Sequence, residues 1–205
     1  MIGQTARIGA RDIALECSKM LAQTSAYILG ADNAAVMRLD GLVRSAGFAQ
    51  TRRFVSASDV VQRRHAHIAF IFLDEALDPA TLAAVRADIR GCADAGLRFM
   101  PIIQFSRDVS AKARRAKAAL GFDDVIDPEG TGEEIARRLE MQLDRNRDYF
   151  ETATYFGPDR RLGRAADAGP GLVVHPCRHY VIRRIPASGI KVVRQEEMGS
   201  ARASA

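Results

Sequence analysis

Three aspartates and a serine stand directly after four short apolar segments, where their side chains could form one binding site. They are Asp32, Asp74, Ser106 and Asp127. If the apolar segments are neighbouring strands of a parallel sheet, these side chains lie together at its carboxyl edge, where open α/β sheets bind their ligands. Asp74 is the strongest candidate because it ends the uninterrupted apolar run 68–73, which reads as a buried strand.

The rest of the chain around these residues alternates between strand-like and helix-like patterns. Short apolar runs predict strands, and apolar residues three or four positions apart predict amphipathic helices between them. The predicted strands are 27–31, 51–55, 68–73, 99–105 and 124–126, and the predicted helices are 36–46, 58–64, 82–93, 109–120 and 135–143. Alternating βα units are typical of a parallel sheet covered by helices, so we predict an α/β fold with a five-stranded parallel sheet.

Two further segments flank this unit, which we place at residues 25–148. Residues 1–24 are predicted to form a helical extension that packs on the core or pairs two copies into a homodimer. The apolar residues on one face of that helix are Ile13, Cys17, Met20 and Leu21. Residues 149–205 contain several Gly-Pro breaks, so we expect an irregular tail. Within it, short strands are possible at 172–174, 180–185 and 190–193.

Length and composition limit the classes of protein to which the chain can belong. The chain has 205 residues, 47% of them hydrophobic, which is enough for one full core. It has neither an apolar run of about 18 residues nor a signal-like start, so we expect no membrane span and a cytoplasmic location. Its three cysteines, Cys17, Cys92 and Cys177, are far apart, which favours reduced thiols.

The net charge of +5 is concentrated near the end of the sequence. Residues 151–205 hold nine basic and five acidic residues. A basic tail can attract nucleic acid, anionic lipid or an acidic protein surface, or it can simply be solvated.

The order of the elements and the residues at their ends resemble the receiver domain of bacterial two-component response regulators, over about residues 25–148. The matching positions are Asp32, Asp74 and Ser106. The resemblance implies a flavodoxin-like (βα)5 receiver fold, with Asp74 as the phosphoacceptor and with Asp32 and Asp74 as ligands of Mg²⁺. It also implies that Ser106 bonds the acyl phosphate and that a histidine kinase or phosphotransfer protein is the donor.

The chain departs from the receiver pattern at three positions. Asn33 replaces a second acidic residue, so an anionic oxygen ligand is missing and Mg²⁺ should bind weakly. Asp127 replaces the lysine that pairs with the phosphoryl group, and a carboxylate there would repel that group. Two unit charges about 4 Å apart interact by roughly 4 kcal/mol at an effective dielectric of about 20. Asp124 stands where receivers have a switch aromatic, so the usual relay cannot operate in that form.

These features lead to two hypotheses for a stand-alone, divergent receiver that regulates a two-component pathway through protein contacts. In the first, Asp74 attacks a phosphohistidine in line, and the face of the fourth helix, fifth strand and fifth helix is reshaped for a downstream protein. In the second, the domain is a phosphorylation-independent pseudo-receiver adaptor. Nucleic-acid binding by the tail is a less favoured hypothesis, because the sequence beyond residue 150 has no pattern for the helices of a helix-turn-helix module. With no glycine-rich phosphate loop and no nucleophile elbow, we expect no enzymatic activity.

Two other motifs allow a functional and a structural interpretation. The run His175-Pro176-Cys177-Arg178-His179 contains three potential zinc ligands, but its proline and strand-like flanks match no known spacing. Residues 155–161 combine two aromatics with an arginine pair and could dock on a partner. Alternatively, Tyr155 and Phe156 pack back on the receiver-like unit. His65 and His67 are expected at a surface or sheet edge.

Overall fold

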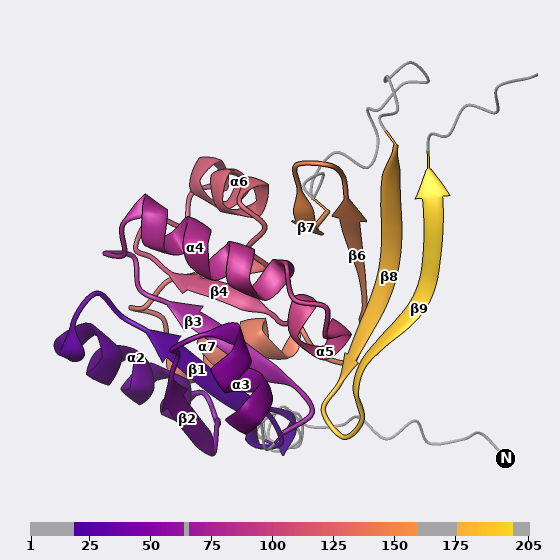
Figure 1. Cartoon of the computed structure of the whole chain (residues 1–205). Coiled ribbons are helices and arrows are strands. Elements are labelled where there is room, and N and C mark those ends of the chain that lie inside the picture. The colour runs from indigo at the N-terminus through magenta and orange to yellow at the C-terminus, as the bar shows by residue number, and fades with distance from the viewer. Residues whose placement is uncertain (1–18, 64–65, 160–175, 199–205) are drawn as a thin grey trace, which may run out of the picture.

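The central element of the protein is a five-stranded parallel sheet (Figure 1). The computed structural model describes residues 19–63, 66–159 and 176–198. The strands are β1 (Ser25–Leu29), β2 (Gln50–Arg53), β3 (Ala69–Leu73), β4 (Ile102–Phe105) and β5 (Asp124–Ile126). Their order is β2-β1-β3-β4-β5, and every neighbouring pair is parallel. This is the order of the flavodoxin-like fold, so the fold class predicted from the sequence is confirmed.

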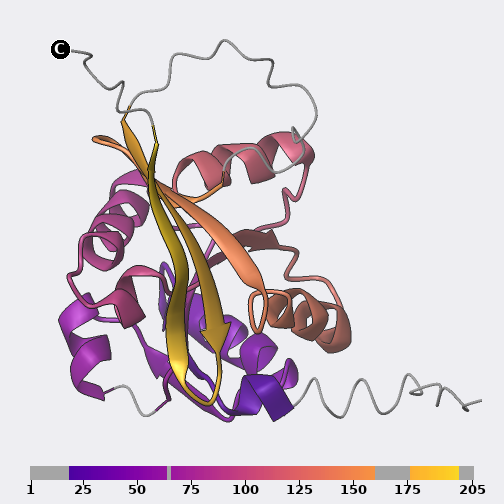
Figure 2. The same cartoon turned by 90° about the vertical axis from the view of Figure 1, so that its right-hand side faces the viewer.

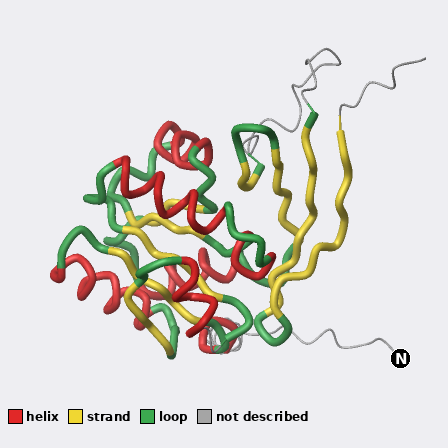
Figure 3. The backbone as a smooth tube through the Cα atoms, in the orientation of Figure 1, coloured by secondary structure: helices red, strands yellow, loops and turns green. Residues whose placement is uncertain are grey.

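Helices cover both faces of this sheet (Figure 3). They are α2 (Asn33–Ser45), α3 (Ala57–Arg63), α4 (Pro79–Arg90), α5 (Ala95–Arg98), α6 (Ala111–Ala119) and α7 (Gly132–Glu140). α2 and α7 share one apolar cluster with Phe70 and Phe72 of β3, whereas α3 and α4 share the other with Ile71 and Leu73. Because both faces are covered, β3 is apolar at every position rather than at alternate ones.

Polar side chains at the carboxyl edge of the sheet cap the N-termini of several helices. Asp32 Oδ1 accepts a hydrogen bond of 2.7 Å from the Ala35 amide and so caps α2. Asp78 caps α4, and Thr131 with Glu134 forms a capping box at the start of α7. These caps fix the loops that surround the candidate site.

The predicted strand 99–105 is wrong in its first three residues. Asp94 caps the short helix α5, and the Phe99 amide donates to the Ala95 carbonyl at the end of that helix. Pro101 has no amide to donate, although its carbonyl accepts from the Ile71 amide at 2.9 Å. The strand therefore begins at Ile102. The apolar pattern of residues 99–101 reflects burial in a turn, not a strand.

The C-terminal region contains a four-stranded antiparallel sheet, which is more regular than the tail expected from the sequence (Figure 2). Its strands are β6 (Asn146–Glu151), β7 (Phe156–Pro158), β8 (Cys177–Ile185) and β9 (Gly189–Met198), in the order β7-β6-β8-β9. The predicted strands 180–185 and 190–193 are the central parts of β8 and β9. The sequence pattern predicts neither their charged ends nor β6, because most side chains there are polar and only Tyr149 of β6 is fully buried. The predicted strand 172–174 lies outside the described residues.

An aromatic cluster joins the two sheets. Phe99 precedes β4, and its ring lies 5.2 to 5.4 Å from the rings of Tyr149, Phe156 and Tyr180 of the C-terminal sheet. Arg98 places its guanidinium 3.9 Å from the centre of the Phe156 ring and forms an ion pair with Glu151. The interpretation that Tyr155 and Phe156 pack back on the parallel-sheet unit is thus confirmed for these two side chains, while Arg160 and Arg161 lie outside the described residues.

The remaining structural expectations concern the flanks, the thiols and the membrane. Of the predicted extension 1–24, residues before Lys19 lie outside the described part, and residues 19–22 are helical. The described cysteines, Cys92 and Cys177, are free thiols. Across residues 19–63, 66–159 and 176–198, no helix has the length and apolar character needed to span a membrane. The predicted boundary between residues 148 and 149 falls within β6.

The contact of β7 with the turn after α6 gives a first prediction. A Cβ at Gly157 would lie 2.6 Å from Tyr155 Oη and 2.8 Å from Gly121 Cα, whereas a Cβ at Gly41 in α2 would meet nothing within 4 Å. We expect Gly157→Ala to lower the free energy of unfolding by about 1–3 kcal/mol through overpacking. Gly41→Ala is the matched control and should raise it by about 0.5–1 kcal/mol. Urea denaturation measures both, and equal effects would contradict the tight docking of β7.

Candidate functional site

The backbone places the four predicted site residues at the carboxyl edge of the parallel sheet. The Asp74 amide continues β3 by donating to the Leu29 carbonyl of β1 at 3.0 Å, and the Ser106 amide donates to the Ile126 carbonyl at 2.9 Å. Ser106 therefore lies next to Asp127, which directly follows Ile126. Asp32 follows β1 at the same edge and caps α2.

Asp74 is the most buried of these residues, with 6% of its surface exposed. Its Oδ1 accepts a hydrogen bond of 2.8 Å from the Ala76 amide, and its Oδ2 lies 3.7 Å from a guanidinium nitrogen of Arg38. The Arg38 side chain is 65% exposed. A buried carboxylate is thus held by one backbone donor and by one cation that reaches it from α2 and the solvent.

The polar side chains that follow β1 are engaged in other contacts. Asp32 Oδ1 caps α2, and Asn33 Oδ1 accepts a hydrogen bond of 2.8 Å from Arg53 of β2. In the described part of the chain, no three His, Cys, Asp or Glu side chains are grouped closely enough to hold a metal ion. Mg²⁺ is usually held by one or two carboxylates together with water molecules. Asp32 Oδ1 and Asp74 Oδ1 each already accept a backbone hydrogen bond, and Mg²⁺ binding by this pair stays a prediction.

Ser106 and Asp127 stabilise their own loops. Ser106 Oγ accepts from the Asp108 amide at 3.2 Å, and Asp127 Oδ1 accepts from the Glu129 amide at 2.9 Å. Both are short turns in which a polar side chain bonds the backbone two residues on. The end of β5 therefore presents a carboxylate where the receiver pattern has an ammonium group.

A groove of about 650 Å³ lies beside Asp74, between α2 and the loops that follow β3, β4 and β5. Charged residues that the sequence analysis did not single out line it: Arg38, Glu75, Arg107 and Glu129. Arg107 lies 3.7 Å from Glu75 and 3.1 Å from Glu129, so it ties two of these loops together. Of the four predicted site residues, only Asp74 lines the groove. The sequence could have indicated two of these charged residues by their position, because Glu75 directly follows Asp74 and Arg107 directly follows Ser106.

The histidine and cysteine motif does not form a metal site in the described residues. His179 Nε2 lies 2.8 Å from Asp148 Oδ1, and its ring stacks on Phe150 with centroids 4.7 Å apart. Cys177 is a free thiol in β8, and His175 lies outside the described residues. His67 is exposed, whereas His65 is outside the described part. His179 is therefore best explained as a structural residue of the second sheet.

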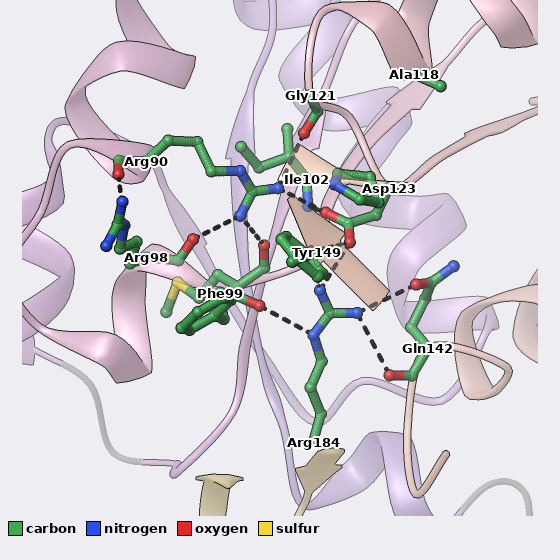
Figure 4. A network of polar contacts seen from close by, with 12 residues as sticks. Arg90, Arg98, Phe99, Ile102, Ala118, Gly121, Asp123, Gln142, Tyr149 and Arg184 are labelled. Carbon is green, nitrogen blue, oxygen red and sulfur yellow. Dashed lines mark hydrogen bonds and ion pairs between the residues drawn. The ribbon is translucent and has the colours of Figure 1, made fainter. Parts of the chain in front are cut away.

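A second polar cluster lies at the opposite, amino edge of the parallel sheet (Figure 4). Its centre is Asp123, which precedes β5 and accepts a hydrogen bond of 2.8 Å from the Ile102 amide at the start of β4. Arg90 of α4 and Arg184 of β8 each place a guanidinium nitrogen 2.7 Å from its carboxylate. Tyr149 of β6 donates its hydroxyl to the same carboxylate. This cluster links the two sheets.

Burial and charge set the protonation of this cluster. Burial alone would raise the pKa of Asp123, but the guanidiniums of Arg184 and Arg90 outweigh it and hold that pKa below its usual value. Burial raises the pKa of the Tyr149 hydroxyl, which stays protonated and donates to Asp123. Other guanidinium N–H groups donate to backbone carbonyls, including those of Arg98, Met100 and Phe99, whereas Arg90 Nε is buried without a hydrogen-bond partner. The cluster is enclosed and both guanidiniums pair with the same carboxylate, so we assign it a structural role.

Comparison with known proteins adds little to this description. No protein-family profile matches the chain, and none of the curated proteins matches it. Among solved structures, the chain is similar to a response regulator in red light signaling of R. palustris, with 16% sequence identity and a TM-score of 0.40. The match covers 58% of this chain and 90% of that chain. The fold class rests on the strand order and parallel pairing of the protein itself.

Proposed function

We propose that this protein is a receiver-like signalling regulator that acts as an adaptor through protein contacts, without phosphorylation of Asp74. The observation that carries the proposal is the environment of the Asp74 carboxylate. It is bonded by the Ala76 amide and paired with Arg38 of α2, while the end of β5 supplies Asp127 instead of a cation. The charge that would stabilise an acyl phosphate from the β5 side is therefore reversed.

Electrostatic repulsion from Asp127 disfavours a phosphoryl group on Asp74. An ammonium group about 4 Å from a phosphoryl oxygen contributes roughly 4 kcal/mol at an effective dielectric of about 20, and a carboxylate at that distance costs a similar amount. Arg38 offsets this cost only in part, because its side chain is 65% exposed and solvent screens its charge. Asn33 supplies no anionic oxygen beside Asp32, so a divalent counterion of the acyl phosphate would also be bound more weakly. These effects disfavour the acyl phosphate, so the groove beside Asp74 is expected to keep its unphosphorylated charge.

Charge in the C-terminal sheet supports a protein partner over nucleic acid. Arg184 is buried against Asp123, and the exposed Arg178, Arg183 and Arg194 each lie within an ion-pair distance of a carboxylate. Nucleic-acid affinity comes mainly from unpaired cations that displace counterions from phosphates. A sheet whose arginines are largely neutralised offers few of them. Within this proposal the protein acts in the cytoplasm and has no enzymatic output.

Phosphotransfer tests the proposal directly. We expect no added phosphoryl mass on the wild-type protein after incubation with Mg²⁺ and acetyl phosphate, or with phosphohistidine-containing kinases. The double variant Asn33→Asp with Asp127→Lys restores the acidic ligand and the cation, so it should gain that mass. Adding Asp74→Asn to the double variant is the control and should abolish the gain. Wild-type labelling that is lost in Asp74→Asn alone would instead support the phosphorylated regulator.

A further inference from the structure

Strand β9 forms a long, open edge of the second sheet. It has ten residues without a proline and stands last in the strand order β7-β6-β8-β9 (Figure 1). No strand of the described residues pairs with its outer side. The other strands at sheet edges, β2, β5 and β7, have four, three and three residues. Because short edge strands limit association between chains, the length of β9 leaves a surface that another strand can join.

Most of β9 is exposed, including apolar side chains. Residues 191–198 are all exposed, whereas residues 179–182 of the neighbouring strand β8 are all buried. Val192, Val193 and Met198 are large apolar side chains that are 39%, 48% and 40% exposed. Packing against the described part of the chain therefore does not explain why apolar residues stand at these positions of an edge strand.

Two opposite charges lie two residues apart on one face of β9. Arg194 and Glu196 are paired in register with Val181 and His179 of β8, and Arg194 Nε lies 3.5 Å from Glu196 Oε1. Glu196 Oε2 also lies 3.8 Å from His179 Nδ1. The Arg194 and Glu196 side chains are 57% and 48% exposed, so each can take a second partner. The register of β9 on β8 shifts between Val181 and Ile182, so the regular part of β9 begins at Arg194.

Symmetry restricts how two copies of β9 can pair. Residues that lie opposite each other in an antiparallel pair point to the same face of the sheet. Two identical antiparallel strands therefore pair symmetrically only about an axis that passes through one residue. An axis at Arg194, Glu196 or Glu197 places that charge opposite its own copy. An axis at Gln195 instead places each Arg194 opposite Glu196 of the second copy, so two pairs of opposite charge form across the contact.

We propose that β9 pairs antiparallel with β9 of a second copy of this chain, centred on Gln195, so that their two four-stranded sheets join into one continuous sheet. The self-complementary charges favour a second copy over an unrelated strand. This contact does not depend on the state of Asp74, and it uses a different surface from the predicted extension 1–24. One pair of edge strands buries less area than a standard interface, so the dimer should be weak, with a dissociation constant in the micromolar range.

Sedimentation velocity of the full chain tests this inference. Between about 1 and 500 µM protein, we expect the wild type to shift from monomer to dimer. Arg194→Glu and Glu196→Arg should each raise the dissociation constant about tenfold or more, because each variant gathers four like charges around the axis. An equimolar mixture of these two variants should regain association, since every facing pair then joins an acidic side chain to a basic one. The double variant Arg194→Glu with Glu196→Arg should dimerise within about threefold of the wild type for the same reason.

A matched charge reversal separates this contact from general electrostatic effects. Arg137 of α7 is 63% exposed and pairs with Glu133, so Arg137→Glu reverses the same charge and removes a similar ion pair away from β9. It should leave the dissociation constant within about twofold of the wild type. Only folded variants can regain association, so the mixture and the double variant also show that the single variants lost a contact and not their structure.

Four outcomes would overturn the inference. They are a wild type that stays monomeric, a dimer that neither single variant on β9 weakens, an equal loss in Arg137→Glu, and no association in either the mixture or the double variant. No phosphodonor is present in this experiment. Its failure therefore leaves the phosphotransfer result untouched, and phosphorylation of Asp74 would leave the dimer standing.

Discussion

Asp123→Asn should lower the free energy of unfolding by about 3–5 kcal/mol, as measured by urea denaturation near neutral pH. The Asp123 carboxylate is the shared counter-ion of Arg90 and Arg184, whose side chains are 4% and 0% exposed. An asparagine of the same shape would leave two guanidiniums buried without a counter-charge. Removing one partner of a buried ion pair is costly because the remaining charge has lost its water as well as its partner.

The control for this prediction is an aspartate in an exposed ion pair. Asp40 pairs with Arg44 four residues later on α2, with side chains 35% and 52% exposed. Asp40→Asn should change stability by less than about 1 kcal/mol, since water replaces the lost partner. A loss at Asp123 no larger than the loss at Asp40 would show that the buried cluster does not hold the sheets together.

The same variant should also change the dependence of stability on pH. The pKa of Asp123 is lower in the folded protein than its unfolded value of about 3.9. A carboxylate with a depressed pKa stabilises the fold fully above its unfolded pKa, and this contribution is lost as the pH falls through the folded value. The unfolding free energies of wild type and Asp123→Asn should therefore converge below about pH 4. A difference that stays constant from neutral to acidic pH would contradict this assignment.

A fragment ending at Arg145 should fail to fold cooperatively. The cut removes Tyr149 and Arg184, which bond Asp123, together with the aromatic rings that cover Phe99. Arg90 and Asp123 would then be exposed at the amino edge of the sheet, next to uncovered apolar surface. We expect the fragment to bind a hydrophobic dye and to lose near-ultraviolet circular dichroism, as loosely packed compact states do.

A chain ending at Met198 is the control for the fragment, because it keeps every contact between the two sheets. It should unfold in one cooperative transition near the stability of the full chain. A fragment that ends at Arg145 and still unfolds cooperatively would show that residues 25–148 form an independent domain and that the C-terminal sheet is an appendage.

The parallel sheet could be predicted from the sequence because burial on both faces makes its central strands, above all β3, nearly continuous apolar runs, whereas the edge strand β2 is polar and partly exposed. The run 68–73 contains β3, and the predicted strand 124–126 coincides with β5. The second sheet could not be predicted in the same way. Its strands hold polar residues that pair across strands or with the other sheet, as Tyr180 does with Glu151, so β6 and the ends of β8 and β9 have no apolar pattern.

The candidate site was partly predictable for a similar reason. Strand ends point to one edge of a parallel sheet, so the positions of Asp32, Asp74, Ser106 and Asp127 followed from the element order. The ion-pair partners of the residues at this edge could not be predicted from the element order. Arg38 reaches Asp74 from the next helix, and Arg107 joins Glu75 to Glu129, and such pairings depend on loop geometry that no local spacing reveals.

Arg184 is synthesised 61 residues after Asp123 and 85 residues after Phe99, with which it shares hydrogen bonds in the finished protein. While the ribosome is still extending the chain through this interval, the nascent parallel sheet has no β8 to close its amino edge. Contacts this distant in sequence slow folding, because the intervening chain must be ordered first. We therefore expect Phe99 and its neighbours to stay exposed until β8 is complete, and the partly made protein to aggregate more readily during that interval.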